Sequence, residues 1–324
     1  MQNEDLVLTE ETTNKAIGLE KEYQFILFDR VEKIKQINEQ YDLLNNAYIS
    51  FSGGKDSTVL SHLIDIALPN NQIPRLFINT GIEYKDIVLF VKELSKEDKR
   101  IKIISSGINI KNMLENEGYP FKSKQHSHNL AIYYNNKDKA DYPKSIKSYL
   151  GLVGSNTLFK CPKMLEYNFT KEFKLHCSDK CCYRLKKEVA AKWQKENEKN
   201  IILTGMRKGE GGQRASIGCI VVEKDKLKKF HPLLVVSEEW EEMFIKENNI
   251  KLCKLYYPPY NFKRTGCKGC PFSLDLQHQL DIMKELLPSE YKQCISLWKP
   301  VYAEYRRIGY RLEKRNLFNF MEDN

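Results

Sequence analysis

Six consecutive residues carry the side chains of a phosphate-binding loop. Residues 52–57 read Ser-Gly-Gly-Lys-Asp-Ser and directly follow the apolar run 47–51. Two adjacent glycines allow a tight turn whose backbone N–H groups converge on one anion, and the N-terminus of a following helix favours negative charge. The hydroxyl groups of Ser52 and Ser57 and the ammonium of Lys55 add donors and positive charge. We therefore predict a phosphate site here, which also includes Gly53, Gly54 and Asp56.

The segment differs from the Walker A loop of P-loop nucleotide hydrolases. Aligning Gly54 and Lys55 with the Gly-Lys pair of that motif places Ile49 where its first glycine belongs. The same alignment places Asp56 where a Ser or Thr hydroxyl should bind Mg²⁺. An ordinary turn between a strand and a helix is the simpler alternative, since glycines are common in turns. The lysine and the two serines favour the phosphate site.

Four of the nine cysteines form two close pairs. Cys181 and Cys182 are adjacent, and Cys267 and Cys270 have two residues between them. Four cysteine thiolates are the usual ligands of one [4Fe–4S] cluster. Two pairs can also form a structural zinc site, although zinc pairs usually leave two or more residues between their ligands. The spacing predicts a metal centre and favours iron and sulfur over Zn²⁺.

Residues 52–57 strongly resemble the PP-loop of the N-type ATP pyrophosphatases. Enzymes of that superfamily cleave ATP between its α and β phosphates and transfer the adenylyl group to a substrate oxygen. The resemblance implies that this loop binds ATP and that a Mg²⁺ ion bridges the phosphates. It also implies that Lys55 and Asp56 take part in catalysis.

Two further segments resemble the phosphoadenosine phosphosulfate (PAPS) reductase branch of that superfamily. Asn79, Thr80 and Gly81 are similar to an Asp-Thr-Gly stretch that lies beside the adenosine in those enzymes, with asparagine replacing the aspartate. The segment 205–214 is similar to their Gly-x-Arg-x-x-Glu-x-x-Arg element, with the second arginine one residue later. The matching residues are Gly205, Arg207, Glu210 and Arg214. The resemblance implies that both arginines are catalytic and face the anionic part of the substrate, which suits planar guanidinium groups.

The cysteine pairs extend this resemblance. They are similar to the set that holds a [4Fe–4S] cluster in the adenylyl sulfate reductases and in the iron–sulfur sulfurtransferase of DNA phosphorothioation. Residues 260–272, which contain Cys267 and Cys270, are similar to the C-terminal signature of the same branch. In motif content the chain is most similar to the phosphorothioation enzyme, and the similarity runs from about residue 47 to residue 273.

Three functions follow from these resemblances. In the first, the enzyme adenylylates an acceptor, releases pyrophosphate and transfers sulfur from a cluster or a cysteine persulfide. The acceptor is then a nucleic acid, DNA or tRNA, and a sulfur-donor protein such as a cysteine desulfurase is the expected partner. In the second, the enzyme reduces adenylyl sulfate or PAPS to sulfite. In the third, the chain is a non-catalytic sensor that binds an adenine nucleotide.

Two features favour the first function. Sulfonucleotide reductases carry their attacking cysteine on a C-terminal Glu-Cys-Gly-Leu-His tail, whereas residues 316–324 read Asn-Leu-Phe-Asn-Phe-Met-Glu-Asp-Asn. The PP-loop of those reductases also tends to be degraded, whereas residues 52–57 are intact and include Lys55. We therefore expect a PAPS reductase-family transferase, with an oxidoreductase as the alternative.

The elements that position these residues alternate between strands and helices. Strand-like runs at 47–51, 75–79, 101–104 and 201–204 are separated by segments with helical periodicity. Such alternation predicts an α/β fold with a doubly wound parallel sheet. The resemblance implies the adenine nucleotide alpha hydrolase type of this fold.

Three regions are expected along the chain. Residues 1–46 form an N-terminal helical segment, and residues 47–232 form the nucleotide-binding domain with a helical insertion at about 118–200. Residues 233–324 form a C-terminal region that carries the second cysteine pair. This region also contains a basic aromatic helix, expected from about residue 302 to residue 318.

The charge and the cysteine content of the chain indicate which binding partners and which cellular compartment to expect. The 324 residues include 52 Lys and Arg against 43 Asp and Glu, a net charge of +9, which favours polyanions such as nucleotides or nucleic acid. The last basic helix either contacts a nucleic-acid backbone or is a solvated amphipathic helix that packs Tyr302 and Tyr305 inward. The first residues lack a secretion signal, and no apolar run approaches the length of a membrane span. An odd number of cysteines cannot all pair, so we expect a cytoplasmic enzyme that does not enter a membrane.

Overall fold

The computed structural model of the chain divides into two compact units. It describes residues 10–136, 141–153, 160–210 and 217–314. The first unit comprises Met1–Phe77, Asp86–Ile104 and Trp193–Lys254. The second unit comprises Ile78–Lys85, Ser105–Lys192 and Leu255–Asn324.

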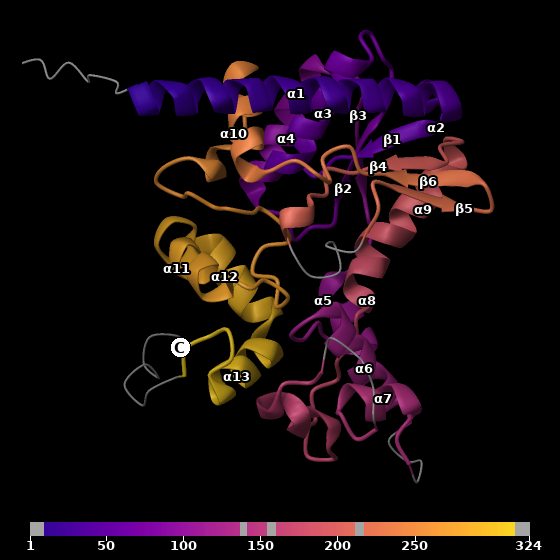
Figure 1. Cartoon of the computed structure of the whole chain (residues 1–324). Helices are drawn as coiled ribbons and strands as arrows, with labels where there is room; N and C mark the ends of the chain where they lie inside the picture. Colours follow the sequence, from indigo (N-terminus) through magenta and orange to yellow (C-terminus); the bar gives the residue numbers. More distant parts are fainter. Residues whose placement is uncertain (1–9, 137–140, 154–159, 211–216, 315–324) are drawn as a thin grey trace, which may run out of the picture. The chain divides into compact units, whose positions relative to one another are not determined.

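A six-stranded sheet lies in the first unit, apart from the last residues of β2 and β3, and has the strand order β3-β2-β1-β4-β6-β5 (Figure 1). Its strands are β1 (Ala47–Ser50), β2 (Arg75–Asn79), β3 (Ile101–Ser105), β4 (Ile201–Leu203), β5 (Ile220–Glu223) and β6 (Lys226–Phe230). Strand β1 pairs in parallel with β2 and β4, and β4 pairs in parallel with β6. The α/β class with a parallel-dominated, doubly wound sheet is therefore confirmed. Strand β5 adds an antiparallel edge through a hairpin with β6.

Several helices accompany this sheet in the first unit. They are α1 (Glu10–Tyr41), α2 (Leu43–Asn46), α3 (Lys55–Ala67), α4 (Lys85–Glu97), the short 3₁₀ helix η3 (Lys208–Glu210) and α10 (Glu238–Glu247). Helix α3 begins directly after the predicted phosphate loop, and apolar residues three or four positions apart form its buried face. Both α1 and α10 pack against α3. Trp240 of α10 lies against Tyr23 of α1, with 5.6 Å between the ring centroids, so α10 is anchored beside the start of α3.

A partly buried ion network joins α3 to the sheet. Asp65 on α3 accepts hydrogen bonds from Nη2 of Arg75 at 2.6 Å and from Nη1 of Arg100 at 2.7 Å. Arg75 on β2 is completely buried. Burial alone would raise the pKa of Asp65, but the hydrogen bond from Arg100 and the charge of Arg75 outweigh it and lower that pKa. Removing Asp65 would leave the buried charge of Arg75 without its carboxylate partner, so this network ties the C-terminal end of α3 to β2.

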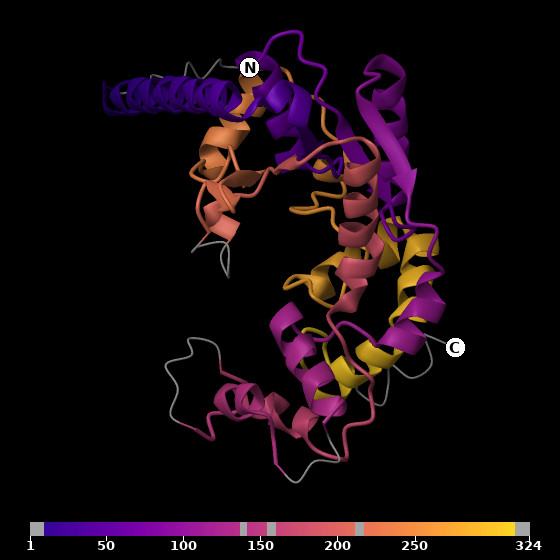
Figure 2. The same ribbon diagram turned by 90° about the vertical axis from the view of Figure 1, so that its right-hand side faces the viewer.

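Short helices make up most of the second unit. They are α5 (Ile110–Glu117), α6 (Lys124–Tyr134), α7 (Lys144–Tyr149), η1 (Lys163–Phe169), α8 (Lys180–Cys182), η2 (Tyr183–Lys187), α11 (Leu276–Leu286), α12 (Pro288–Leu297) and α13 (Lys299–Ile308). Helix α9 (Glu188–Glu196) and the 3₁₀ helix η5 (Lys254–Tyr256) each cross from one unit to the other. Figure 2 shows α8, η2 and α9 following one another as one helical run, with a π-helical turn at η2. None of the helices in the described ranges is both long and apolar enough to cross a membrane.

The last helix is shorter than the sequence predicts. Helix α13 ends at Ile308, because Gly309 adopts the left-handed conformation with φ of 67°, a common way to end a helix. Residues 315–318 of the expected helix lie outside the described residues. Tyr302 and Tyr305 are buried, as the amphipathic alternative expects.

Candidate active site

The loop between β1 and α3 is a tight turn that depends on its glycines. Gly53 has a φ of 70°, in the left-handed region that favours glycine. A Cβ atom at this position would lie 2.5 Å from Cγ2 of Val91 on α4. Gly54 is the N-cap of α3, whose first N–H groups have no acceptors within the helix. The turn therefore presents a helix N-terminus that attracts an anion.

Two serine hydroxyls hold the shape of this loop. Oγ of Ser57 accepts a hydrogen bond from the backbone N–H of Ser52 at 3.1 Å and lies 3.0 Å from Oγ of Ser52. Oγ of Ser52 accepts from the backbone N–H of Gly54 at 3.3 Å, and Oγ of Ser57 lies 2.9 Å from the carbonyl oxygen of Gly54. The serines predicted as phosphate donors thus also tie the two ends of the loop together.

Four charged residues meet at the start of α3, and we name Lys55, Asp56, Arg207 and Glu241 the loop cluster. Arg207 donates through Nε to Oδ1 of Asp56 at 3.0 Å. Nη2 of Arg207 and Nζ of Lys55 each lie 3.3 Å from the same oxygen, Oε2 of Glu241. Nζ of Lys55 also lies 3.3 Å from Oε1 of Glu238, at the exposed edge of the cluster. The structure therefore brings together Lys55, Asp56 and Arg207, which the sequence analysis selected from two separate motifs.

Glu241 is a member of the cluster that the sequence analysis missed. Its side chain is completely buried, and among the described residues neither carboxylate oxygen has a hydrogen-bond partner. Burial, and next the charge of Asp56, raise the pKa of Glu241 to about 7, although Arg207 and Lys55 oppose this rise. The sequence does carry one signal that could have identified Glu241. It is an acidic residue on α10 that stands between the core residues Trp240 and Phe244.

The segment after β4 carries Arg207 to the loop. Strand β4 pairs with β1, and the backbone then passes so close to α3 that a Cβ atom at Gly205 would lie 2.5 Å from the carbonyl oxygen of Asp56. Glu210 ends the short helix η3, and Arg214 lies outside the described residues. Of the two arginines predicted to face the substrate, Arg207 thus lies beside the loop.

The Asn-Thr-Gly segment belongs to the second unit and is held by its own hydrogen bonds. Oδ1 of Asn79 accepts from the backbone N–H of Gly81 at 3.0 Å. The carboxylate of Glu83 accepts from the backbone N–H and from the hydroxyl of Thr80, both at 2.8 Å. Oε1 of Glu83 lies 3.4 Å from Nζ of Lys186. These contacts fix the backbone that follows β2.

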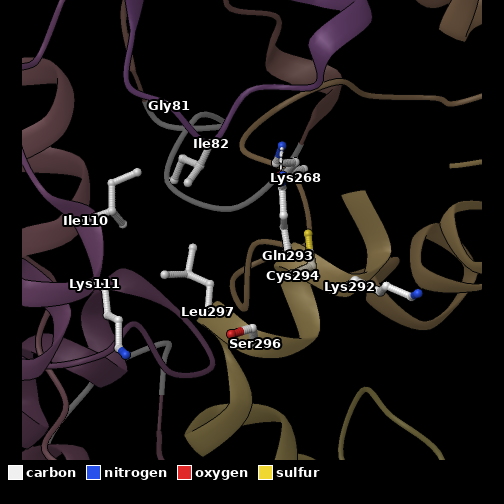
Figure 3. A pocket seen from close by; sticks show the side chains of 10 residues that line it. All are labelled: Gly81, Ile82, Ile110, Lys111, Lys268, Lys292, Gln293, Cys294, Ser296 and Leu297. Carbon is white, nitrogen blue, oxygen red and sulfur yellow. Dashed lines mark hydrogen bonds between the residues drawn. The ribbon is translucent and has the colours of Figure 1, made fainter. Parts of the chain in front are cut away.

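A cavity of about 450 Å³ opens beside Gly81 in the second unit (Figure 3). Figure 3 shows the side chains of Ile82, Ile110 and Leu297 lying together in this cavity. Its other lining residues are Lys111, Lys268, Lys292, Gln293, Cys294 and Ser296. Nζ of Lys268 donates to Oε1 of Gln293 at 2.9 Å. An apolar wall with nearby ammonium groups is suited to an organic anion.

The four cysteines of the predicted metal centre all belong to the second unit. Burial, and then the charges of Cys182, Cys267 and Cys270, raise the pKa of Cys181. Burial and the charge of Cys267 raise the pKa of Cys270 to about 12. Such mutual effects require short distances, so the turn that carries Cys267 and Cys270 lies near α8. The charge of Cys267 also raises the pKa of Lys186, which places that ammonium beside the thiols.

The donor chemistry of this cysteine group suits a cluster of iron and sulfur, since four thiols and a nearby cation are present. Within the described ranges, however, no group of three or more His, Cys, Asp or Glu side chains is arranged so that it can hold a metal ion. The structure therefore brings the predicted ligands into one region without giving them the geometry of a ligand set.

A protein-family model matches more than half of the chain. The model described as the phosphoadenosine phosphosulfate reductase domain matches residues 46–140 and 159–273. An uncharacterized protein of Methanocaldococcus jannaschii, MJ0973, is 35% identical over an alignment of 103 residues, and the match covers 29% of this chain. The match spans only a quarter, 25%, of the length of that relative.

Solved structures with a similar fold have low sequence identity to this chain. A phosphoadenylyl-sulfate reductase from Candida auris, in a phosphate complex, has a TM-score of 0.42 and 16% identity, over 74% of this chain and 87% of that one. The U34-tRNA thiolase NcsA from Methanococcus maripaludis, with its [4Fe–4S] cluster, has a TM-score of 0.37 and 16% identity, over 91% of this chain and 82% of that one.

Proposed function

Because the chain belongs to the phosphoadenosine phosphosulfate reductase domain family, we propose that it binds ATP at residues 52–57 and transfers the adenylyl group to an acceptor oxygen. The observation that carries this proposal is the loop cluster. Lys55 and Arg207 place two cations at the N-terminus of α3, where the helix dipole also favours an anion.

In the proposed reaction the acceptor oxygen attacks the α-phosphorus of ATP. The bond from the α-phosphorus to the oxygen that bridges to the β-phosphate breaks, and pyrophosphate leaves with the electron pair. Lys55 and Arg207 offset the negative charge that develops on the phosphate oxygens. Mg²⁺, when bound, would neutralise further phosphate charge, and Asp56 supplies a carboxylate of the type that binds it. Arg207 keeps that carboxylate in place through its hydrogen bond to Oδ1.

For the second half of the reaction we propose sulfur transfer to a nucleic acid, DNA or tRNA. The terminal sulfur of a cysteine persulfide, formed with a sulfur-donor protein such as a cysteine desulfurase, attacks the activated carbon or phosphorus, and AMP leaves with the acceptor oxygen. A thiol reductant then cleaves the S–S bond, so that the transferred sulfur stays on the acceptor at the oxidation level of sulfide and the two cysteine and reductant sulfurs leave as a disulfide. We assign Cys181, Cys182, Cys267 and Cys270 to a [4Fe–4S] cluster, with a structural Zn²⁺ as the alternative. Their shared region and the neighbouring Lys186 support this assignment.

The decisive test is pyrophosphate release by the anaerobically purified protein with ATP, Mg²⁺ and a panel of DNA, tRNA and small acceptors. We expect release that depends on one of the acceptors. Lys55→Ala should lower its rate by about 10²-fold or more, because a cation that stabilises the transition state is lost. Lys96→Ala, at an exposed lysine on α4 of the same unit, is the matched control and should not change the rate.

Two results would contradict the proposal. Release of sulfite from adenylyl sulfate with a thiol reductant, without pyrophosphate release from ATP, would favour the reductase alternative. Iron, zinc and sulfide analysis of the same preparation tests the cysteine assignment, and stoichiometric zinc would exclude the cluster.

A further inference from the structure

The cavity beside Gly81 has no part in the proposed adenylyl transfer, although it has the size and the lining of a binding site. All of its lining residues belong to the second unit. Its volume of about 450 Å³ lies in the range of sites for small organic groups. The side chains of Ile82, Ile110 and Leu297 lie together in it, as Figure 3 shows. This apolar wall favours the face of an uncharged ring.

The buried cation that lines the cavity, Lys268, is already compensated. Its side chain is 7% exposed, and its Nζ lies 3.4 Å from Oε1 of Glu290, whose side chain is 3% exposed. Nζ of Lys268 also donates to Oε1 of Gln293, which lines the cavity. Drawing Lys268 away from its carboxylate would leave a buried charge unpaired, so the pair has little attraction left for another anion. The buried part of the cavity therefore suits a neutral group that forms hydrogen bonds.

The other two charged residues that line the cavity are also lysines, and both are exposed. Lys111 lies on α5 and Lys292 lies on α12. Figure 3 shows them on opposite sides of the apolar side chains, with their ammonium groups pointing away from that wall. Exposed ammonium groups attract negative groups to the edges of the cavity and not to its interior. The lining as a whole is therefore suited to a neutral ring with a negative group on each side.

We propose that this cavity binds one base of a single-stranded nucleic acid, and that Lys111 and Lys292 contact the phosphates on either side of that base. The inference rests on the proposed function, which makes a nucleic acid the acceptor and so favours a base over other flat groups. A base is uncharged, and its apolar face fits the wall of isoleucine and leucine side chains. Its edge can form hydrogen bonds with the amide of Gln293 and the hydroxyl of Ser296. The strand must be unpaired, because a base inside a duplex is stacked and paired.

A small organic anion would use this lining less completely. Its charged end would contact one of the two exposed lysines and leave the other without a function. A nucleic-acid strand continues past the bound base in both directions, so its phosphates reach both Lys111 and Lys292.

Fluorescence anisotropy with labelled oligonucleotides tests this inference. The probes are single strands of DNA and RNA of mixed sequence, and a DNA strand of the same length in which every nucleotide is abasic. The wild type should bind the strands with bases about tenfold more tightly than the abasic strand, because the charge is equal and only bases can pack on the apolar wall. Leu297→Trp, which fills the cavity, should bind all strands alike and should bind ATP as the wild type does.

The salt dependence of binding tests the two lysines. Lys111→Ala combined with Lys292→Ala removes two phosphate contacts, so the slope of log affinity against log salt concentration should become shallower by about 1.4 for a single strand. Lys171→Ala combined with Lys299→Ala is the charge-matched control, because both are exposed lysines of the same unit that do not line the cavity. Its slope should equal that of the wild type. These exposed positions keep the inference testable if Leu297→Trp does not fold.

Equal affinity of the wild type for strands with and without bases would overturn the inference, as would equal slopes for the two double variants. It would also be overturned if free CMP or UMP bound as tightly as the oligonucleotides, or if Leu297→Trp lost ATP binding, since the cavity would then hold a free nucleotide. Pyrophosphate release with a small acceptor, without oligonucleotide binding, would overturn this inference and leave adenylyl transfer intact. A preference for bases that Leu297→Trp removes, without pyrophosphate release, would support the cavity and contradict adenylyl transfer.

Discussion

Position 205 requires glycine because neighbouring atoms leave no room for a side chain, not because of its own backbone conformation. A Cβ atom there would lie 2.5 Å from the carbonyl oxygen and 2.8 Å from the carbonyl carbon of Asp56. These are backbone atoms in the first turn of α3, so they cannot move aside as a flexible side chain does. Gly53 differs, because its left-handed φ of 70° already favours glycine. Because Gly205 has no side chain, the segment after β4 can approach α3 closely, and this approach brings Arg207 to the loop.

We predict that Gly205→Ala weakens the binding of pyrophosphate by about tenfold or more. The added methyl group must push the segment after β4 away from α3, and this separates Arg207 from Asp56. Overpacking of this kind also lowers the free energy of unfolding by about 1–3 kcal/mol. Calorimetry measures the first effect and urea denaturation the second. Gly209→Ala is the control, since a Cβ atom at Gly209 meets nothing within 4 Å. Unchanged affinity in Gly205→Ala would show that this approach does not position Arg207.

At the scale of elements, His126 connects three helices of the second unit. It lies on α6, Nδ1 lies 2.9 Å from the hydroxyl of Tyr149 on α7, and Nε2 lies 3.2 Å from Oδ1 of Asn168 on η1. An amide oxygen only accepts, so Nε2 carries the proton, and Nδ1 accepts from the tyrosine hydroxyl. The neutral ring satisfies both contacts. A second proton on Nδ1 would break the hydrogen bond to Tyr149.

The second unit, which contains His126, should lose stability in mild acid. Burial, and then the charge of Lys122, lower the pKa of His126 to about 3. In the unfolded chain the pKa of a histidine is about 6.5, so the unfolded state binds a proton first as the pH falls. The contribution of neutral His126 is therefore complete above pH 6.5 and is lost progressively down to about pH 3. Between pH 7 and pH 5 this loss amounts to about 2 kcal/mol.

We predict that His126→Phe reduces this dependence on pH. A phenyl ring retains the contacts with Phe121 and Phe169 but cannot take up a proton. The variant should be less stable than the wild type at pH 7, because two hydrogen bonds are lost. Its free energy of unfolding, from urea titrations, should fall by about 2 kcal/mol less between pH 7 and pH 5. His128→Phe, at an exposed histidine of the same helix, should retain the wild-type dependence. If the free energy of unfolding fell equally with pH in the wild type and in His126→Phe, this pH dependence could not be assigned to His126.

For the whole molecule, the elements that depend on local sequence patterns were predicted well. Strand β2 (Arg75–Asn79) has the predicted bounds, and strand β3 (Ile101–Ser105) extends one residue beyond the predicted run. Their apolar periodicity and their flanking turn residues lie within a few positions, so they can be read without knowing the fold. The loop before α3 was found for the same reason, since its glycines, lysine and serines are consecutive.

Features that depend on tertiary contacts were not predicted. Glu241 reads as one of several acidic residues on an amphipathic helix, and only the packing of α10 against α3 shows that it meets Lys55 and Arg207. The hairpin of β5 and β6 was also missed, because four of its outer residues are lysines or glutamates and its alternation is weak. The sequence groups the four thiols by their two close pairs, but how the two pairs are arranged relative to each other depends on the fold of the second unit.

The charge of the whole chain leads to the last prediction, which concerns the nucleic-acid acceptor. The chain has a net charge of +9, and Tyr302 and Tyr305 are buried, so the basic helix α13 offers no aromatic side chain on which bases can stack. Contacts from Lys and Arg to phosphates should therefore dominate nucleic-acid binding by α13, and such contacts release counterions and weaken steeply with salt. For about four phosphate contacts, raising the salt concentration from 50 to 200 mM should lower the affinity for tRNA or DNA by about 10²-fold.

Fluorescence anisotropy with labelled tRNA and DNA measures this dependence directly. Lys55→Ala is an informative companion, because it alters the proposed ATP site and should leave the salt dependence of nucleic-acid binding unchanged. An affinity that does not vary with salt, or no binding at 50 mM, would contradict a nucleic-acid acceptor. Since the loop cluster and its proposed adenylyl transfer do not depend on the acceptor, the same result would redirect the search to small molecules that carry a nucleophilic oxygen.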